Sequence, residues 1–256
     1  MHFTIDLSWA WAWWLLSIRL ALVVMASPFD MFGRLPGRIR FFLVFALALL
    51  MVRFSPTAGA QLPSSIVEMA LACANELVLG LAMALGLHAA FTVFQIAGRL
   101  IDFQSGFGAA NIMNPATNSA EPLMGTILLF FATFVFFSMD AHHMVIKGLA
   151  YSVAQVPPGS GLARMDFNGA MKQVGLMFSF AMVLAAPVLA VLFLLDVGVA
   201  VMARTMPQMN VYFLFLPLKV ALGIGVTALS LKYLTPLIGE VFISIFRYWS
   251  GMLTVI

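Results

Sequence analysis

Near its middle, a chain built from long apolar segments is interrupted by a glycine- and amide-rich run, which reads RLIDFQSGFGAANIMNP at residues 99–115. Irregular backbone at membrane depth must be buried in protein or line a water-filled path, because lipid cannot satisfy its N–H and C=O groups. The sequence therefore predicts a specialised loop between membrane-type helices. This loop is therefore the first candidate for a functional segment.

The composition explains why the loop stands out. Hydrophobic residues make up 63% of the 256 residues and charged residues only 9%, whereas soluble domains carry roughly 25% charged residues. Mean hydropathy is +1.05, which predicts a protein embedded in a membrane or enclosed in a hydrophobic assembly. The single cysteine, Cys73, excludes an intramolecular disulfide. The 13 basic residues are too scattered to form a nucleic-acid-binding cluster.

Six apolar segments predict an all-α fold of membrane-type helices, at about residues 9–25, 41–54, 66–101, 123–139, 174–203 and 211–231, followed by an apolar tail at 235–256. The second is short and the third is long for a bilayer core of about 30 Å, and Pro187 is expected to interrupt the fifth. Lys and Arg divide evenly between alternate connections, so the positive-inside rule selects no orientation. Hairpins that do not fully cross, held by partner subunits, therefore fit better than a six-span bundle.

The first segment begins with a cluster of aromatic side chains, Trp9, Trp11, Trp13 and Trp14. Tryptophan is enriched where a helix meets the membrane–water boundary. The residues before the segment include Asp6 but no Lys or Arg, so the positive region of a signal peptide is missing. We expect an uncleaved helix with an interfacial anchor.

Glu76 is the candidate buried charge of the third segment. It shares a four-residue spacing, and therefore one helix face, with three small residues and a histidine, which are Ala72, Gly80, Ala84 and His88. Small residues permit close helix approach, so we expect this face to be covered by helices. A carboxylate buried there requires an Arg or backbone donors as its partner. An assembly contact is the favoured role, and a proton relay is the alternative.

Other charges lie near the ends of apolar segments. Arg99 and Asp102 are three residues apart, so they are predicted to form a local salt bridge that anchors the loop; a gating role is the alternative. Asp196 and Arg204 share one face of the fifth segment, and either is able to pair with another subunit.

His142 and His143 resemble metal ligands at first sight. Adjacent helical residues point about 100° apart, and no Cys or third His lies nearby in the sequence. The sequence also contains no nucleophile elbow, phosphate-binding loop or zinc-helix motif. We therefore expect no catalytic residue, no cofactor and no metal.

Several short motifs occur along the chain, and the central one is GRLIDFQSGFG at residues 98–108. Others are AHH at 141–143, ARTMPQMNV at 203–211 and LPLK at 216–219, where Lys219 joins the candidate buried charges. The run from Arg19 to Arg38 and NELVLG at 75–80 belong to the same set. Together these motifs resemble those of the FliR family of flagellar biosynthetic proteins, and their order and spacing agree over almost the whole chain.

The resemblance implies an all-helical subunit, with one domain over residues 1–256, whose hairpins look like a fusion of the FliP and FliQ folds. It implies assembly with FliP-like and FliQ-like subunits into the pore of the flagellar type III export gate. FlhB-like and FlhA-like gate proteins, exported unfolded proteins and membrane lipid are further expected partners. The expected location is the inner membrane at the flagellar basal body, with much of the assembled core above the membrane plane on the periplasmic side.

By the same resemblance, about residues 106–121 form a plug in the closed pore. The candidate plug residues are Gly106, Phe107, Gly108, Asn111, Ile112, Met113, Asn114 and Pro115. Asn114 departs from the family pattern, in which many flagellar members place an acidic residue before the proline. The alternative is the homologous subunit of a virulence-type injectisome. A small-solute secondary transporter is more distant, because it requires two repeated halves that the sequence does not show.

Overall fold

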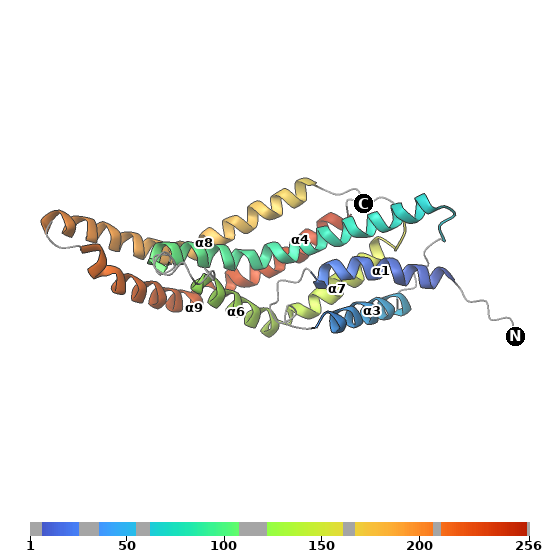
Figure 1. Ribbon diagram of the computed structural model, residues 1–256, viewed down its shortest axis with the longest axis horizontal. Coiled ribbons are helices and arrows are strands. Elements are labelled where there is room, and N and C mark those ends of the chain that lie inside the picture. Colours follow the sequence, from blue (N-terminus) through green and yellow to red (C-terminus); the bar gives the residue numbers. More distant parts are fainter. Residues whose placement is uncertain are drawn as a thin grey trace. The chain divides into compact units, whose positions relative to one another are not determined.

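The computed structural model describes residues 7–25, 36–54, 62–107, 122–160, 167–206 and 211–254, which contain helices and no strand. The helices are α1 (Leu7–Met25), α3 (Gly37–Phe54), α4 (Ile66–Ser105), α6 (Leu123–Ser138), α7 (Ala141–Gln155), α8 (Phe167–Thr205) and α9 (Val211–Thr254) (Figure 1). The expected all-α fold of membrane-type helices is therefore confirmed for the described residues.

Four of these helices are long and apolar enough to cross a membrane: α1, α4, α8 and α9. The pair α6 and α7 adds a fifth span if it is counted as one, although the two helices are bent by 71° at the break between them. The expected short second segment corresponds to α3, which is not among the candidate spans of the described chain. Six apolar segments thus correspond to four or five candidate spans.

The helix boundaries differ from the expected ones in three places. Residues 140–172, which lie between the fourth and fifth expected segments, contain α7, and the apolar tail at 235–256 continues α9 through Pro236. The expected interruption of the fifth segment at Pro187 is wrong, because α8 runs through this proline. A proline removes one backbone N–H, and apolar surroundings offer the remaining groups no better partner than the helix itself.

The start of α4 is set by its own side chains. Ser65 Oγ accepts a hydrogen bond of 3.2 Å from the backbone N–H of Glu68, and the Glu68 carboxylate accepts one of 2.7 Å from the backbone N–H of Ser64. This reciprocal pattern is close to a capping box and satisfies donors that a helix start leaves open. It explains why the helix begins at Ile66, directly after Ser65.

The described residues form two compact units. The first unit comprises the described parts of residues 1–90, 140–174 and 243–256. In it α1 packs beside α3 (Figure 1), and Trp13 Nε1 donates a 3.1 Å hydrogen bond to the carbonyl of Phe45. Trp249 is almost completely buried and donates from Nε1 to the carbonyl of Met83 at 3.1 Å. Both indole N–H groups are therefore satisfied inside apolar surroundings.

The second unit comprises the described parts of residues 91–139 and 175–242. Its core is an aromatic cluster around Phe242 of α9, whose ring centroid lies 5.4 Å from that of Phe91, 5.9 Å from that of Phe94 and 5.1 Å from that of Phe136. These separations suit tilted and edge-on ring packing. The cluster joins α4, α6 and α9 within this unit.

The small-residue face of α4 is covered only in part. Glu76, Gly80 and Ala84 are buried, Ala72 is half-buried and His88 is exposed. The expectation that the whole face is covered is therefore wrong at His88. A spacing of four residues gains about 40° at each step over a helix of 3.6 residues per turn, so the first and last members point in different directions.

Gly80 allows α1 to approach α4 within the first unit. A Cβ atom there would lie 2.9 Å from the carbonyl oxygen of Arg19 and 2.9 Å from Leu22 Cδ1. We expect Gly80→Ala to lower the free energy of unfolding by roughly 1–3 kcal/mol, since overpacking forces the backbone to shift. Thermal unfolding of the purified chain in detergent measures this.

Gly198→Ala is the matched control, because Gly198 is also helical but a Cβ atom there would have nothing within 4 Å. We expect it to be neutral or slightly stabilising, since alanine favours a helix over glycine. Equal melting temperatures for the two variants would contradict a close contact at Gly80.

Candidate functional site

The predicted plug, residues 106–121, lies mostly outside the described residues. Gly106 and Phe107 are described, whereas Gly108 and the other candidate plug residues, Asn111, Ile112, Met113, Asn114 and Pro115, are not. What the structure supplies is the geometry of the two flanks, the end of α4 and the start of α6. Both flanks belong to the second unit.

Gly106 ends α4 in a conformation that other residues rarely adopt. Its φ is 86°, in the left-handed region where glycine carries no steric penalty. A Cβ at this position would also lie 2.7 Å from Leu216 Cδ1 of α9. Both observations explain why glycine is the residue that follows the last turn of α4.

Asp102 holds the other flank. Its buried carboxylate accepts hydrogen bonds from the backbone N–H of Met124 at 3.0 Å and 3.1 Å, and from that of Gly125 at 3.4 Å. Pro122, the N-cap residue of α6, makes no side-chain cap bond. Asp102 thus replaces the missing cap, and its negative charge faces the positive end of the helix.

The predicted salt bridge between Arg99 and Asp102 is wrong. The Arg99 side chain is exposed, and the ion pairs among the described residues do not include this one. Asp102 turns instead toward the start of α6, where open backbone donors provide fixed hydrogen bonds in a buried setting. A spacing of three residues permits a pair but does not compete with such donors.

The backbones of α4 and α6 touch beside this cap. A Cβ on Gly98 would collide with the backbone N and Cα of Gly125. The two glycines therefore set the distance at which the Asp102 carboxylate reaches the α6 backbone. Asp102, Gly98 and Gly125 together fasten the C-terminal flank of the loop to the helix that precedes the loop.

Asp196 of α8 forms the centre of a polar cluster in the same unit. Its Oδ1 lies 2.7 Å from Lys219 Nζ of α9, and its Oδ2 accepts a 2.8 Å hydrogen bond from Gln104 Nε2 of α4. Lys219 is almost buried and Asp196 is about one-third exposed. The sequence alone left the partner of Asp196 open, and the structure pairs it within the chain. Arg204 is exposed at the end of α8.

Glu76 lies in the first unit and is paired with Arg19 of α1. Arg19 Nε lies 2.7 Å from Glu76 Oε2, and Arg19 Nη2 lies 3.0 Å from Oε1. The same guanidinium donates to Ser152 Oγ at 3.2 Å and to the carbonyl of Val156 at 3.0 Å. Arg19 has no exposed surface, and Glu76 is 3% exposed. This two-pronged pair, with further acceptors, is the geometry that a buried ion pair requires.

Sequence reasoning missed three of these polar residues, Arg19, Ser152 and Gln104. A signal existed for Arg19, because it is the single charged residue in the apolar stretch 9–25. An arginine inside one apolar helix and a carboxylate inside another are natural partners. Neither Ser152 nor Gln104 carries a comparable signal, since their roles depend on helix positions that only the fold supplies.

His142 and His143 have an acidic neighbour that the sequence analysis did not consider. The candidate ligand atoms of Asp140, His142 and His143 lie within 4.8 Å of one another. His143 Nδ1 is 3.4 Å from Asp140 Oδ1, and both side chains are more than half exposed. Asp140 takes a left-handed conformation, with φ of 55°, directly before α7. The three residues come from one turn of chain, and this arrangement also suits an ordinary polar contact at a helix start.

Breaking the Arg19–Glu76 pair is expected to be costly. Glu76→Leu leaves the Arg19 guanidinium buried without its counter-charge, so we expect the free energy of unfolding to fall by about 3–5 kcal/mol. The double variant Arg19→Met with Glu76→Leu removes both charges and is expected to recover most of this loss. Chemical unfolding in detergent measures both. A double variant as unstable as Glu76→Leu would show that the pair is not the source.

Removing the Asp102 cap is expected to loosen the start of α6. Asp102→Ala leaves the N–H groups of Met124 and Gly125 without their acceptor, at a cost of about 1–2 kcal/mol. Hydrogen exchange at residues 123–126 should become faster. Arg99→Ala is the control, and it should leave exchange there unchanged because Arg99 is exposed. Equal exchange in the two variants would contradict the capping role.

Comparison with known proteins identifies the family. The family described as bacterial export proteins, family 1, matches residues 10–245. The chain is 35% identical to the flagellar biosynthetic protein FliR of Bacillus subtilis over 66% of each chain. It is 28% identical to FliR of Aquifex aeolicus over 85% of this chain and 84% of the relative. It is also 29% identical to Yop proteins translocation protein T of Yersinia pestis over 58% of each chain.

The family match covers most of the chain, including the Arg19–Glu76 pair, the contacts of Asp196 and the cap of α6. The relatives include flagellar proteins and a translocation protein, so the resemblance seen in the motifs is confirmed. The chain belongs to the bacterial export proteins of family 1, the family of the flagellar FliR proteins and their injectisome relatives.

Proposed function

We propose that this chain is a structural, pore-forming subunit of the flagellar type III protein export gate. The observation that carries the proposal is the family match over residues 10–245 together with the similarity to FliR proteins. In this role the chain assembles with FliP-like and FliQ-like subunits. FlhB-like and FlhA-like gate proteins are further partners, and unfolded flagellar proteins pass through the assembly.

The surfaces of α8 and α9 support an assembly role. In an apolar 18-residue stretch of α8 only 28% is buried within the chain, and in the corresponding stretch of α9 only 17% is buried. Large apolar side chains such as Phe193, Phe213 and Leu229 are exposed on them. Apolar surface of this extent requires lipid or other subunits as cover. The proposed location is the inner membrane at the flagellar basal body, with much of the assembled core on its periplasmic side.

The paired charges support a structural role without catalysis. Glu76 is paired with Arg19, Asp196 with Lys219, and Asp102 with backbone donors. A general acid, base or nucleophile needs a group that is free to exchange a proton or attack a substrate, whereas these groups hold helices together. We propose that the subunit performs no chemical step and binds neither a cofactor nor a metal for this role.

The flanks of the central loop support its proposed function as a plug, at about residues 106–121. The left-handed turn at Gly106 fixes its start, and the Asp102 carboxylate fixes the helix that follows it. Fixed ends confine a loop to one region. A polar loop at membrane depth needs a protein-lined or watery space, and a pore lumen formed with partner subunits provides one. The loop then blocks ions and small molecules until an exported protein displaces it.

A second candidate is the homologous subunit of a virulence-type injectisome. The similarity to the Yersinia translocation protein favours it, although the identity extends over a smaller share of the chain than with the Aquifex FliR protein. Restoration of swimming in a FliR-deficient bacterium by this gene would support the flagellar assignment. Rescue of effector secretion alone would support the injectisome instead.

Deletion of residues 108–120 tests the plug. We expect the complex to assemble in normal amount but to conduct small ions, since the lumen loses its seal. Single-channel conductance of the reconstituted complex measures this, and growth under salt stress measures it in cells. Deletion of residues 56–60, in another connection, is the control and should leave the complex tight.

Assembly with unchanged tightness after deletion of residues 108–120 would contradict the plug. The loop would then be a connector between hairpins, while the export role would stand. Failure to isolate any complex with FliP-like and FliQ-like subunits, by contrast, would contradict the export role itself.

A further inference from the structure

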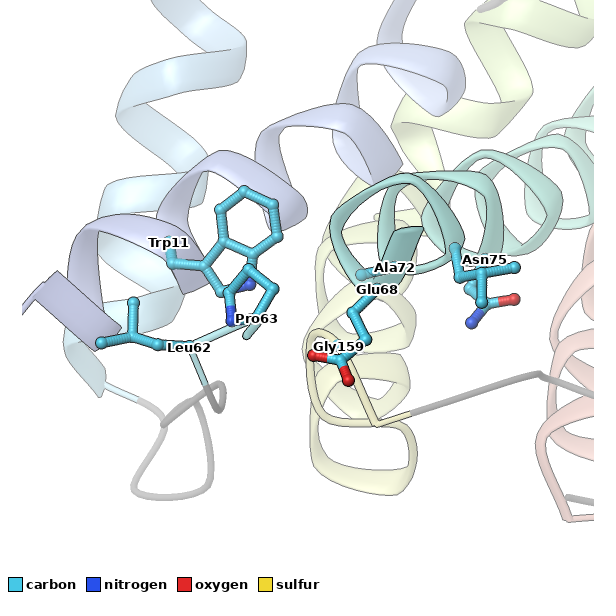
Figure 2. A pocket seen from close by; sticks show the side chains of 8 residues that line it. Trp11, Leu62, Pro63, Glu68, Ala72, Asn75 and Gly159 are labelled. Carbon is cyan, nitrogen blue, oxygen red and sulfur yellow. The ribbon is translucent and has the colours of Figure 1, made fainter. Parts of the chain in front are cut away.

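The first unit contains a cavity that the export role does not use. Its volume is about 290 Å³, and it lies between the first turns of α1 and α4. Trp11 of α1 lines one side, Glu68 and Asn75 of α4 line the other, and Gly159 is a further lining residue (Figure 2). Leu62 and Leu71 supply apolar surface. The cavity is therefore amphipathic, with polar groups at defined places.

Glu68 presents one carboxylate oxygen to this cavity. Its Oε2 accepts hydrogen bonds from the backbone N–H of Ser64 at 2.7 Å and from Ser64 Oγ at 2.8 Å. Both bonds use Oε2, so they orient the carboxylate while Oε1 stays available to a ligand. The described residues that line the cavity include no Lys or Arg. A cationic group is therefore favoured at this end, and an anionic one is disfavoured.

The polar groups follow an order along α4. Glu68, Ala72 and Asn75 share one helix face, and Glu68 and Asn75 are about 10 Å apart along the axis at 1.5 Å per residue. Both α1 and α4 are candidate membrane spans, and the cavity lies near their N-terminal ends. A carboxylate thus lies outermost, with an amide further in. Trp11 lies opposite, and tryptophan is typical of the membrane–water boundary.

We propose that this cavity binds the headgroup of a phospholipid that carries a primary ammonium group, as phosphatidylethanolamine does. From the outside inward such a lipid presents an ammonium, then a phosphate, then acyl chains. The ammonium meets Glu68 Oε1, and the phosphate accepts hydrogen bonds from the Asn75 amide and the Trp11 indole N–H. The acyl chains continue along the apolar surface of α1 and α4. The proposal does not depend on the plug or on the export role.

Competition between two lipids tests the site. The full-length chain is purified in mild detergent with any partner subunits that remain bound, and it is offered equal amounts of phosphatidylethanolamine and phosphatidylglycerol with identical acyl chains. Native mass spectrometry counts the lipid that stays bound. We expect about a fivefold excess of phosphatidylethanolamine, which corresponds to the upper range of one exposed ion pair.

Glu68→Gln keeps the shape and an oxygen acceptor for Ser64 but removes the charge, so we expect the ratio of the two lipids to fall to about one. Glu240→Gln is the matched control, because Glu240 is an exposed helical glutamate outside the cavity lining. It should retain the fivefold preference. Ala72→Leu fills the cavity without touching a polar group and is expected to lower the binding of both lipids.

Three results would overturn the proposal. They are an equal affinity of the unaltered chain for the two lipids, an unchanged preference in Glu68→Gln, and unchanged lipid binding in Ala72→Leu. Recovery of a tightly bound peptide from the cavity in place of lipid would also overturn it, and would assign the site to a protein partner.

Discussion

The fully buried ion pair between Arg19 and Glu76 is the constraint on which the first unit depends. Neither group can leave water without the other, because an isolated charge in apolar surroundings is very costly. The pair fixes α1 against α4, and the hydrogen bonds to Ser152 and Val156 extend the same constraint to α7. In this unit the polar contacts determine how α1, α4 and α7 are aligned, while the apolar side chains fill the space between the helices.

In the second unit polar contacts also hold the helices together, but its ion pair is more exposed than that of the first unit. The Asp102 carboxylate caps the start of α6, and Asp196 links α4, α8 and α9 through its contacts with Gln104 and Lys219. Both clusters lie near the point where α4 gives way to the central loop. In this unit the polar contacts thus gather around the end of α4 and the start of α6, the two helix ends that flank the central loop.

Much of this fold could be predicted from the sequence, and the predictions that were wrong or incomplete have physical causes. Apolar runs predicted the helices, and the four-residue spacing around Glu76 predicted a buried carboxylate with a partner. The interruption expected at Pro187 was wrong, because this proline lies inside a continuous helix. The partner of Asp102 was also out of reach, since Met124 and Gly125 act through backbone groups whose positions depend on the fold. The plug role of residues 106–121 stays a prediction.

The distance in sequence between the members of the buried ion pair has a consequence for biosynthesis. Arg19 and Glu76 are 57 residues apart, and Val156 follows Arg19 by 137 residues. At about 5–20 residues per second of translation, Arg19 is synthesised roughly 3–11 seconds before its counter-charge exists. During that interval an arginine sits in an apolar helix at a cost of about 2.5–3.5 kcal/mol for membrane insertion. The contact that buries this charge safely therefore forms only after α4 has been made, and its last acceptor, the carbonyl of Val156, is added later still.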